Sequence, residues 1–160
     1  MKIKILDYGM GNHMSVIKAI KYLGYDCEII DDLNLTKNVD FLILPGVGSY
    51  DKAIKNLEKS KNINSIKELA LKKKIPILGI CLGMQLFSTT GTEGILTNGL
   101  NLIPGDVKKI NTDSQHLPHI GWNNVSVQNN DFLNYNNIDF YFFHSYSYNV
   151  FNKKHILMTH

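Results

Sequence analysis

The sequence predicts an α/β protein with a doubly wound, mostly parallel sheet flanked by helices, and with antiparallel strands in the C-terminal half. Short apolar runs alternate with segments of helical periodicity as far as residue 88, which is typical of parallel strands joined by helices. After that point, strand-like segments follow one another without helical patterns between them. A chain of 160 residues with no internal repeat or linker is expected to form one domain, spanning residues 1–160.

The first predicted unit is a strand, a helix and a second strand. Residues 2–6 and 25–30 are the strands, and the helix between them ends near Gly24. The glycine-containing turn at residues 7–12 (Asp-Tyr-Gly-Met-Gly-Asn) suggests a dinucleotide site. However, Met14 occupies the place of the third glycine of that fingerprint, so we favour a plain loop that leads into a helix.

A cysteine at the centre of the chain carries the strongest chemical signal. Residues 75–80 are a continuous apolar run, which predicts a strand buried on both faces, and residues 84–87 open a helical pattern. Cys81 lies between them with Gly79 and Gly83 on either side, the spacing of a nucleophile elbow. An inert buried cysteine is the alternative, but the two glycines in this context favour a nucleophile whose thiolate a helix N-terminus stabilises.

A second glycine-containing loop is expected beside this elbow. The predicted strand at residues 40–44 leads directly into residues 45–48 (Pro-Gly-Val-Gly). Because the carboxyl ends of parallel strands meet at one edge of a sheet, this loop and Cys81 are expected to lie together. The backbone N–H of Leu82 and a donor from this loop would then stabilise an oxyanion.

The C-terminal half contains predicted strands and an unusual histidine-containing stretch. A hairpin or meander is expected at residues 100–110, an aromatic strand at 140–146 and another strand at 155–160. His116 and His119 are three residues apart, but a proline breaks the helix that would align them, and no cysteine or carboxylate cluster is near. We therefore expect neither a metal nor an organic cofactor.

Composition excludes several classes of function. The net charge is +3, but all 17 basic residues are lysines, so bidentate recognition of phosphates or bases by arginine is absent and nucleic-acid binding is disfavoured. No apolar run is long enough to span a membrane, and no signal peptide is evident. Two cysteines, Cys27 and Cys81, do not make a disulfide framework, and a cytoplasmic location is expected.

Five motifs together resemble a known family. They are residues 7–12, residues 45–48, residues 79–85 (Gly-Ile-Cys-Leu-Gly-Met-Gln), residues 118–123 (Pro-His-Ile-Gly-Trp-Asn) and residues 141–146 (Tyr-Phe-Phe-His-Ser-Tyr). In this order they resemble class I (triad-type) glutamine amidotransferases. The fourth motif narrows the resemblance to the glutaminase subunits of imidazole glycerol phosphate synthase, an enzyme of histidine biosynthesis, and their paralogues.

The resemblance implies a flavodoxin-like amidotransferase fold and a defined chemistry. Cys81 would attack the side-chain amide of glutamine and release ammonia, which passes to a (β/α)8-barrel synthase subunit in a heterodimer. The resemblance also implies the roles of other residues. Oxyanion stabilisation or glutamine binding would fall to Gly46, Val47, Gly48, Leu82, Gln85, Ser145 and Tyr146, and the partner interface to Asn12, Trp122, Asn123 and Tyr141.

The sequence departs from the family at the catalytic base. In the family that base is a histidine in a late His-Pro-Glu motif, which these residues do not contain, and His144 belongs to the His-Ser-Tyr segment instead. We therefore expect a C-terminally incomplete amidotransferase domain. Two alternatives stay open: a paralogue that supplies ammonia for amidation of a surface sugar, or a non-catalytic interaction protein.

Overall fold

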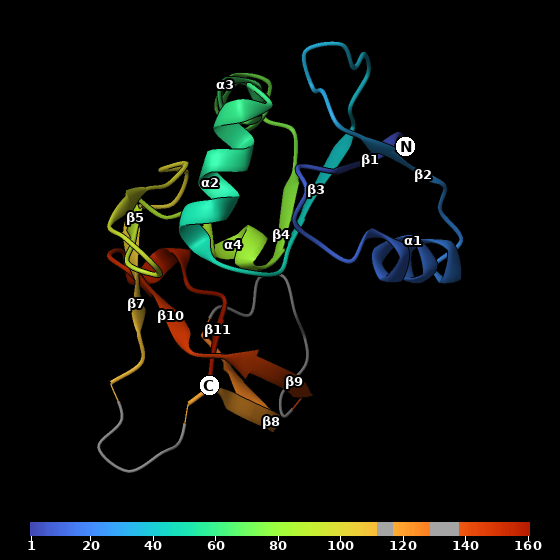
Figure 1. The fold of residues 1–160 in the computed structure, drawn as a ribbon. Helices are drawn as coiled ribbons and strands as arrows, with labels where there is room; N and C mark the ends of the chain where they lie inside the picture. The colour runs from blue at the N-terminus through green and yellow to red at the C-terminus, as the bar shows by residue number, and fades with distance from the viewer. Residues whose placement is uncertain (112–116, 129–137) are drawn as a thin grey trace.

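A four-stranded parallel sheet forms the centre of the protein (Figure 1). The computed structural model describes residues 1–111, 117–128 and 138–160. The strand order is β2 (Cys27–Ile30), β1 (Ile3–Leu6), β3 (Phe41–Gly46) and β4 (Ile77–Cys81), all parallel. The four strands predicted in the first half of the chain are therefore confirmed, with shifts of one or two residues at their ends.

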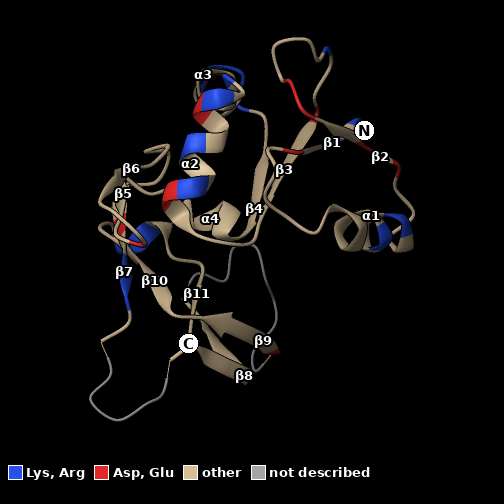
Figure 2. Cartoon of the chain, viewed as in Figure 1, with Lys and Arg blue, Asp and Glu red and all other residues tan. Residues whose placement is uncertain are grey.

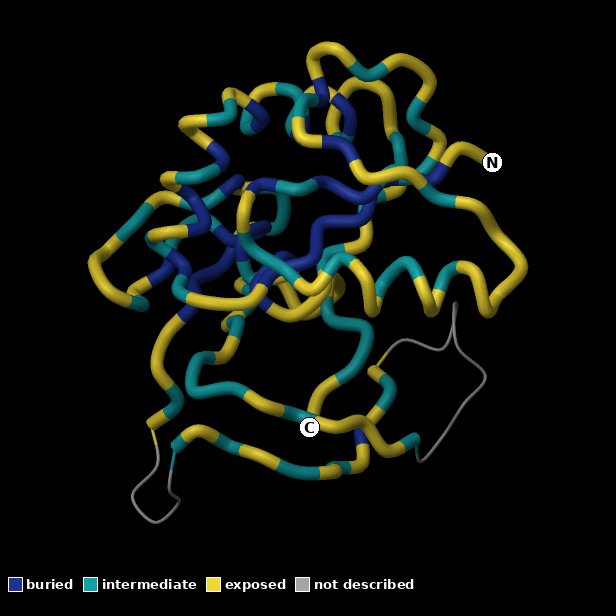
Figure 3. The backbone as a smooth tube through the Cα atoms, turned by 45° about the vertical axis from the view of Figure 1, so that its right-hand side comes forward, coloured by how far each residue is buried: buried dark blue, intermediate teal, exposed yellow. Residues whose placement is uncertain are grey.

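Helices cover both faces of this sheet, which confirms the doubly wound prediction. On one face, α1 (His13–Tyr22) packs against Ile3, Ile5 and Ile43. On the other face, α2 (Tyr50–Lys59), α3 (Asn62–Lys67) and the π-helical segment Glu68–Lys72 contribute to the larger core, which also contains Leu6, Leu42 and Leu44. The buried positions gather in this layer around the sheet (Figure 3).

The last strand of the sheet is less buried than the sequence predicts. Leu78 is paired with Ile43 and points to the face that α1 covers, yet Leu78 is 46% exposed. Ile80, two residues further on the same face, is also exposed. The prediction of burial on both faces is wrong for this strand because α1 packs on β1 and β3, and no described residue covers β4 there.

The C-terminal half contains two further sheets. One has the order β10 (Tyr146–Val150), β7 (Gly105–Lys109), β5 (Thr90–Gly91), β6 (Thr97–Asn98), and only its β5–β7 pair is parallel. The other is antiparallel: β8 (His119–Val127) lies between β9 (Ile138–His144) and β11 (Met158–Thr159). The expected aromatic strand is present as β9. The strand expected at residues 155–160 is reduced to the two residues of β11, because residues 153–155 form a 3-10 helix instead. The C-terminal strands are largely antiparallel.

The prediction of a hairpin or meander at residues 100–110 is wrong. Only β7 forms there, because the backbone N–H groups of residues 100–103 donate to carbonyls of residues 86–88 instead of to a neighbouring strand. The histidine at position 116 lies outside the described residues. Within the described ranges, no helix has the length and apolar character needed to cross a membrane.

Candidate active site

Cys81 lies where β4 ends and the short helix α4 (Leu82–Gln85) begins, as the sequence predicts. Its backbone has φ 54° and ψ −115°, a conformation that few residues other than glycine adopt. Such strain costs about 1–3 kcal/mol and persists only where the surrounding structure imposes it. Cys81 is exposed and not disulfide-bonded, so the turn presents a reactive group at the carboxyl edge of the sheet.

The two glycines beside Cys81 are required by close packing. A Cβ atom on Gly79 would lie 2.5 Å from the Cα atom of Met84, on the first turn of α4. A Cβ atom on Gly83 would lie 1.8 Å from the backbone oxygen of Leu44, on the neighbouring strand β3. Both contacts are with backbone atoms that cannot move aside, so the elbow needs glycine at each position.

The Pro-Gly-Val-Gly segment lies beside the nucleophile. Gly46 is the direct partner of Cys81 in the β3–β4 pairing, which confirms that the two loops share one edge of the sheet. Val47 is exposed, and Gly48 has a positive φ of 115°. The backbone after Gly46 is therefore close to the place where an oxyanion would form at Cys81.

The α4 helix stabilises a thiolate at Cys81 less than the sequence suggests. It is only four residues long, so its macrodipole is small and provides little stabilisation of a thiolate. The first N–H groups of a helix have no partner inside the helix, and here these belong to Leu82 and Gly83. They are the donors that the elbow offers to a developing negative charge.

Tyr8 is a residue of the site that sequence reasoning missed. It is buried, and its hydroxyl donates to the backbone oxygen of Pro45 at 2.7 Å. Burial, and next the nearby charge of Cys81, raise the pKa of Tyr8 well above its ordinary value, so the hydroxyl stays protonated and donates. Only the strand order of the folded sheet reveals this role, since it places the residue that follows β1 beside the end of β3.

Gln85 and Tyr146 come together from distant parts of the chain. The side-chain Nε2 of Gln85, at the end of α4, donates to the backbone oxygen of Tyr146 at 3.1 Å. Ser145 is the single residue between β9 and β10, and its carbonyl accepts from the backbone N–H of Ile110 at 2.9 Å. Three of the residues predicted to bind glutamine are thus assembled around one bend beside the elbow helix.

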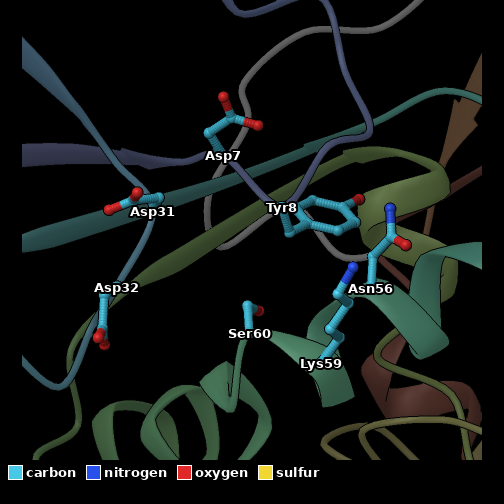
Figure 4. A pocket seen from close by; sticks show the side chains of 7 residues that line it. All are labelled: Asp7, Tyr8, Asp31, Asp32, Asn56, Lys59 and Ser60. Atoms are coloured by element: carbon cyan, nitrogen blue, oxygen red, sulfur yellow. The ribbon is translucent and has the colours of Figure 1, made fainter.

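A separate cavity of about 500 Å³ lies at the carboxyl ends of β1 and β2 (Figure 4). Asp7, Asp31 and Asp32 line it, together with one lysine, Lys59. Hydrogen bonds from the backbone and side-chain N–H groups of Asn34 lower the pKa of Asp32, which is therefore ionised at neutral pH. Such an acidic lining repels a phosphate group and agrees with our preference for a plain loop over a dinucleotide site.

An exposed apolar surface covers one side of the β8–β9 pair. We name Ile120, Trp122, Tyr141 and Phe143 the aromatic face, because they lie on one side of two paired strands and are all exposed. The rings of Trp122 and Tyr141 meet edge to face, 5.7 Å apart between centroids. Figure 2 shows that charged residues are nearly absent from β8 and β9.

Two other residues predicted at the partner interface do not belong to this face. Asn123 follows Trp122 in β8, so its side chain points to the opposite side of the strand pair. Asn12 lies before α1 and caps it, its side-chain oxygen accepting from the backbone N–H of Ser15 at 3.3 Å.

Three histidines gather under the aromatic face, but the structure does not link them to Cys81. The ring centroids of His119, His144 and His160 lie 5.4–5.6 Å from one another. No group of three ligating side chains in the part of the chain that the structure describes is arranged to hold a metal ion. Among the same residues, neither a hydrogen bond nor an ion pair joins a histidine to Cys81, so the structure identifies no catalytic base.

Comparison with known proteins identifies the family. The profile described as glutamine amidotransferase class-I matches residues 4–160, nearly the whole chain. The chain belongs to the class I glutamine amidotransferases. The resemblance of the five motifs to class I glutamine amidotransferases is thereby confirmed.

Similar proteins define the relationship more closely. The chain is 43% identical over 148 residues to the imidazole glycerol phosphate synthase subunit HisH of Moorella thermoacetica. This alignment covers 90% of this chain and 69% of the relative. The chain is 45% identical over 150 residues to the HisH subunit of Caldanaerobacter subterraneus, covering 92% and 73%. A crystal structure of a glutamine amidotransferase with 13% sequence identity has the same fold, with a TM-score of 0.76 over 98% of this chain and 78% of that one.

Proposed function

We propose that this amidotransferase is the glutaminase subunit of imidazole glycerol phosphate synthase, in histidine biosynthesis. The names of its relatives support this assignment, and they give no support to an amidotransferase of surface sugars. The observation that carries the chemistry is the strained, exposed Cys81 paired directly with Gly46. A thiol held at such an elbow beside backbone donors suits nucleophilic attack on an amide.

The reaction proceeds through a thioester. The thiolate of Cys81 attacks the side-chain carbonyl carbon of glutamine, and the oxygen that becomes negative accepts hydrogen bonds from backbone N–H groups of Leu82 and of the Gly46–Gly48 segment. The carbon–nitrogen bond then breaks, the nitrogen takes up a proton and ammonia leaves. Water attacks the glutamyl thioester, which releases glutamate and restores the thiol.

The backbone groups of glutamine are held at the bend between β9 and β10. Gln85 is already in contact with Tyr146, and Ser145 lies between them and β9. Amide, hydroxyl and backbone groups of these three residues suit the α-ammonium and α-carboxylate of an amino acid, since they offer both acceptors and donors. This arrangement would select glutamine by its amino-acid end while its amide reaches Cys81.

The aromatic face is proposed to bind the synthase subunit that receives the ammonia. The names of the relatives imply another subunit, and we propose a (β/α)8 barrel that forms a heterodimer with this chain in the cytoplasm. Large exposed aromatic side chains without neighbouring charge are typical anchors of protein interfaces. Trp122, which is 71% exposed, is the residue best placed to be such an anchor, with Tyr141 beside it. Asn12 and Asn123 would contribute from outside the aromatic face.

We also propose that residues 1–160 form one amidotransferase domain that lacks the family's catalytic histidine and glutamate. The absence of a His-Pro-Glu sequence from these residues supports this proposal. A non-catalytic role would follow only if Cys81 did not react as a glutamine-directed nucleophile. The test of function must therefore examine Cys81 in a way that does not depend on complete turnover.

A diazoketone analogue of L-glutamine provides that test, because it alkylates a thiol that is positioned at the glutamine amide. We expect one adduct on Cys81, identified by intact mass and peptide mapping, and protection by L-glutamine. The D-isomer is the control for substrate recognition, and Cys27→Ser is the control for the second thiol. Labelling that is absent, that glutamine does not slow, or that the D-isomer matches would overturn the proposed function.

A further inference from the structure

We infer that His144 is a positioning residue for glutamine binding: its ring N–H holds the Tyr146 carbonyl in the place where that carbonyl orients the side-chain amide of Gln85. The inference deepens the proposed function and rests on it. Family resemblance assigns roles to Ser145, Tyr146 and Gln85 but none to His144. The role follows instead from two hydrogen bonds that meet on one oxygen atom.

The hydrogen bond between His144 and Tyr146 has a defined direction. The Nδ1 of His144 lies 3.1 Å from the backbone oxygen of Tyr146. A carbonyl oxygen can only accept, so Nδ1 carries the proton and donates. In the neutral ring the proton is then absent from Nε2, which is buried and without a hydrogen-bond partner among the described residues. The surroundings of the ring thus suit the neutral tautomer that has its proton on Nδ1.

The backbone oxygen of Tyr146 also accepts a hydrogen bond from Gln85. The Nε2 of Gln85 donates to it at 3.1 Å, so the two lone pairs of the Tyr146 carbonyl are both used. An amide that donates through Nε2 leaves its Oε1 as an acceptor. The α-ammonium group of an amino acid is the donor that this acceptor would take. Turning the Gln85 amide over would present an N–H group to the ammonium and repel it.

His144 is itself held in place by its neighbours. It is the last residue of β9, and its ring lies in the cluster with His119, His160 and Phe142, with centroids 5.4–5.7 Å away. The next residue, Ser145, is tied to Ile110 by a backbone hydrogen bond. The ring cluster and this bond fix the bend from two sides, so the Tyr146 carbonyl has a defined direction before glutamine arrives.

Two substitutions at His144 distinguish the effect of the N–H donor from the effect of the aromatic ring. His144→Phe keeps an aromatic ring in the cluster but removes the donor, whereas His144→Asn loses the ring but places an N–H donor near the position of Nδ1. His119→Phe is the matched control, because this ring lies in the same cluster and makes no hydrogen bond to Tyr146 in the described structure. Each variant is compared with the unchanged chain in its alkylation by the diazoketone analogue of glutamine.

The kinetics of alkylation give an affinity and a maximal rate separately. We expect H144F to weaken the affinity for the analogue, and the protection by L-glutamine, by about three- to tenfold, the effect of one lost hydrogen bond. The maximal rate should stay within about twofold, since the elbow is untouched. H144N should retain most of the affinity, and H119F all of it. Equal affinity in H144F and the unchanged chain, or equal losses in H144F and H119F, would overturn the inference.

A second measurement does not depend on glutamine chemistry. The side-chain NH2 protons of Gln85 give their own signals in a ¹⁵N-correlated NMR spectrum, and a hydrogen bond to a carbonyl shifts one of them. We expect that signal to move in H144F and to stay in H144N and H119F. An unmoved Gln85 signal in H144F refutes the positioning role whatever the alkylation shows. If the unchanged chain does not react although the Gln85 signal moves in H144F, the proposed function is refuted, and with it the role of His144 in glutamine binding.

Discussion

Gly83 lies so close to the backbone oxygen of Leu44 that a single added Cβ atom would come within 1.8 Å of it. This contact joins the first turn after the nucleophile to the neighbouring strand. The strained backbone of Cys81 is held from this side and, through Gly79, from the start of α4. The reactive geometry is therefore a property of backbone packing between β3, β4 and α4.

We predict that Gly83→Ala abolishes this geometry. The added methyl group must displace β3 or α4, and we expect a loss of at least 3 kcal/mol in unfolding free energy, the upper part of the range for overpacked cores. Gly24→Ala is the control: Gly24 also has a positive φ, but a Cβ there would meet nothing within 4 Å. That change should cost only about 1–2 kcal/mol. Urea unfolding of both variants checks this, and equal losses would show that the clash at Gly83 is relieved.

The local part of the site was predictable from sequence, and the long-range part was not. Cys81 and its two glycines are within five consecutive residues, so the elbow is visible as a spacing. The contact between Gln85 and Tyr146 spans 61 positions, and without the resemblance nothing in the pattern around either residue indicates the other. Tyr8 was missed because its role depends on which strand lies beside β1, and the order of strands is set by packing of the whole sheet.

The prediction that β4 is buried on both faces failed for the same reason. An apolar run predicts burial, but whether both faces are covered depends on which elements reach that edge, and α1 packs instead on β1 and β3. By contrast, the alternation of strands and helices predicted the central sheet well, because each parallel strand must be followed by a connection that crosses back over the sheet. Sequence patterns thus predicted the helices and strands themselves more reliably than which of them pack against one another.

Tyr8→Phe should weaken the segment beside Cys81 without changing its shape. Removing the hydroxyl leaves the backbone oxygen of Pro45 without its donor, and the expected loss is about 0.5–1.5 kcal/mol in unfolding free energy. We also expect slower alkylation of Cys81 by the diazoketone analogue, since the Gly46 backbone follows Pro45 directly. The measurement is the maximal rate of alkylation.

Tyr148→Phe is the matched control for that experiment. Its hydroxyl also donates to a backbone oxygen, that of Ile103, but in the second sheet. The two variants should lose similar stability, and only Tyr8→Phe should slow the alkylation. If both variants slow it equally, the effect is one of general stability, and Tyr8 has no special part in the site.

Trp122→Ala should weaken binding to a barrel synthase subunit. Truncation of an aromatic anchor commonly costs about 2 kcal/mol or more, which corresponds to a loss in affinity of about 30-fold. Tyr22→Ala is the control, because Tyr22 is 91% exposed but belongs to α1, outside the aromatic face. Titration calorimetry with the purified partner measures both. An unchanged affinity in Trp122→Ala would remove this residue from the interface.

The attachment of β11 to β8 should depend on pH through His160. Burial lowers the pKa of His160 below its ordinary value of 6.5, and the nearby rings of His144 and His119 lower it further. The folded arrangement therefore binds fewer protons than a detached strand, and its stability rises with pH. Attachment is at full strength above the ordinary pKa and is lost progressively as the pH falls below about 6.5.

Amide exchange of Gln128 measures this attachment, since its backbone N–H donates to Leu157 at 2.8 Å just before β11. Its protection should fall between about pH 7 and pH 5 in the unchanged chain. In His160→Gln the fall should be much smaller, because glutamine does not titrate. A fall of the same size in both chains would assign the pH dependence to other groups.

The last prediction is that thiol reactivity and turnover are separate in this chain. Cys81 is exposed at a strained turn, whereas Cys27 lies in β2 and is partly buried, so Cys81 should be alkylated faster by iodoacetamide. Turnover also requires a base that takes the thiol proton and then activates water, a contribution of about 10²–10⁴-fold. No described histidine is bonded to Cys81, and the residues contain no His-Pro-Glu sequence.

We therefore expect this chain, with its barrel partner and the partner's ligand present, to label readily at Cys81 but to hydrolyse glutamine slowly. A version extended through a His-Pro-Glu segment should hydrolyse glutamine about 10²–10⁴-fold faster with little change in labelling rate, because the elbow is already formed without that segment. Equal turnover by the two versions would mean that one of the histidines present supplies the base. Single alanine substitutions at His144, His155 and His160 would then identify it, since only the base itself would reduce turnover without changing the affinity for glutamine.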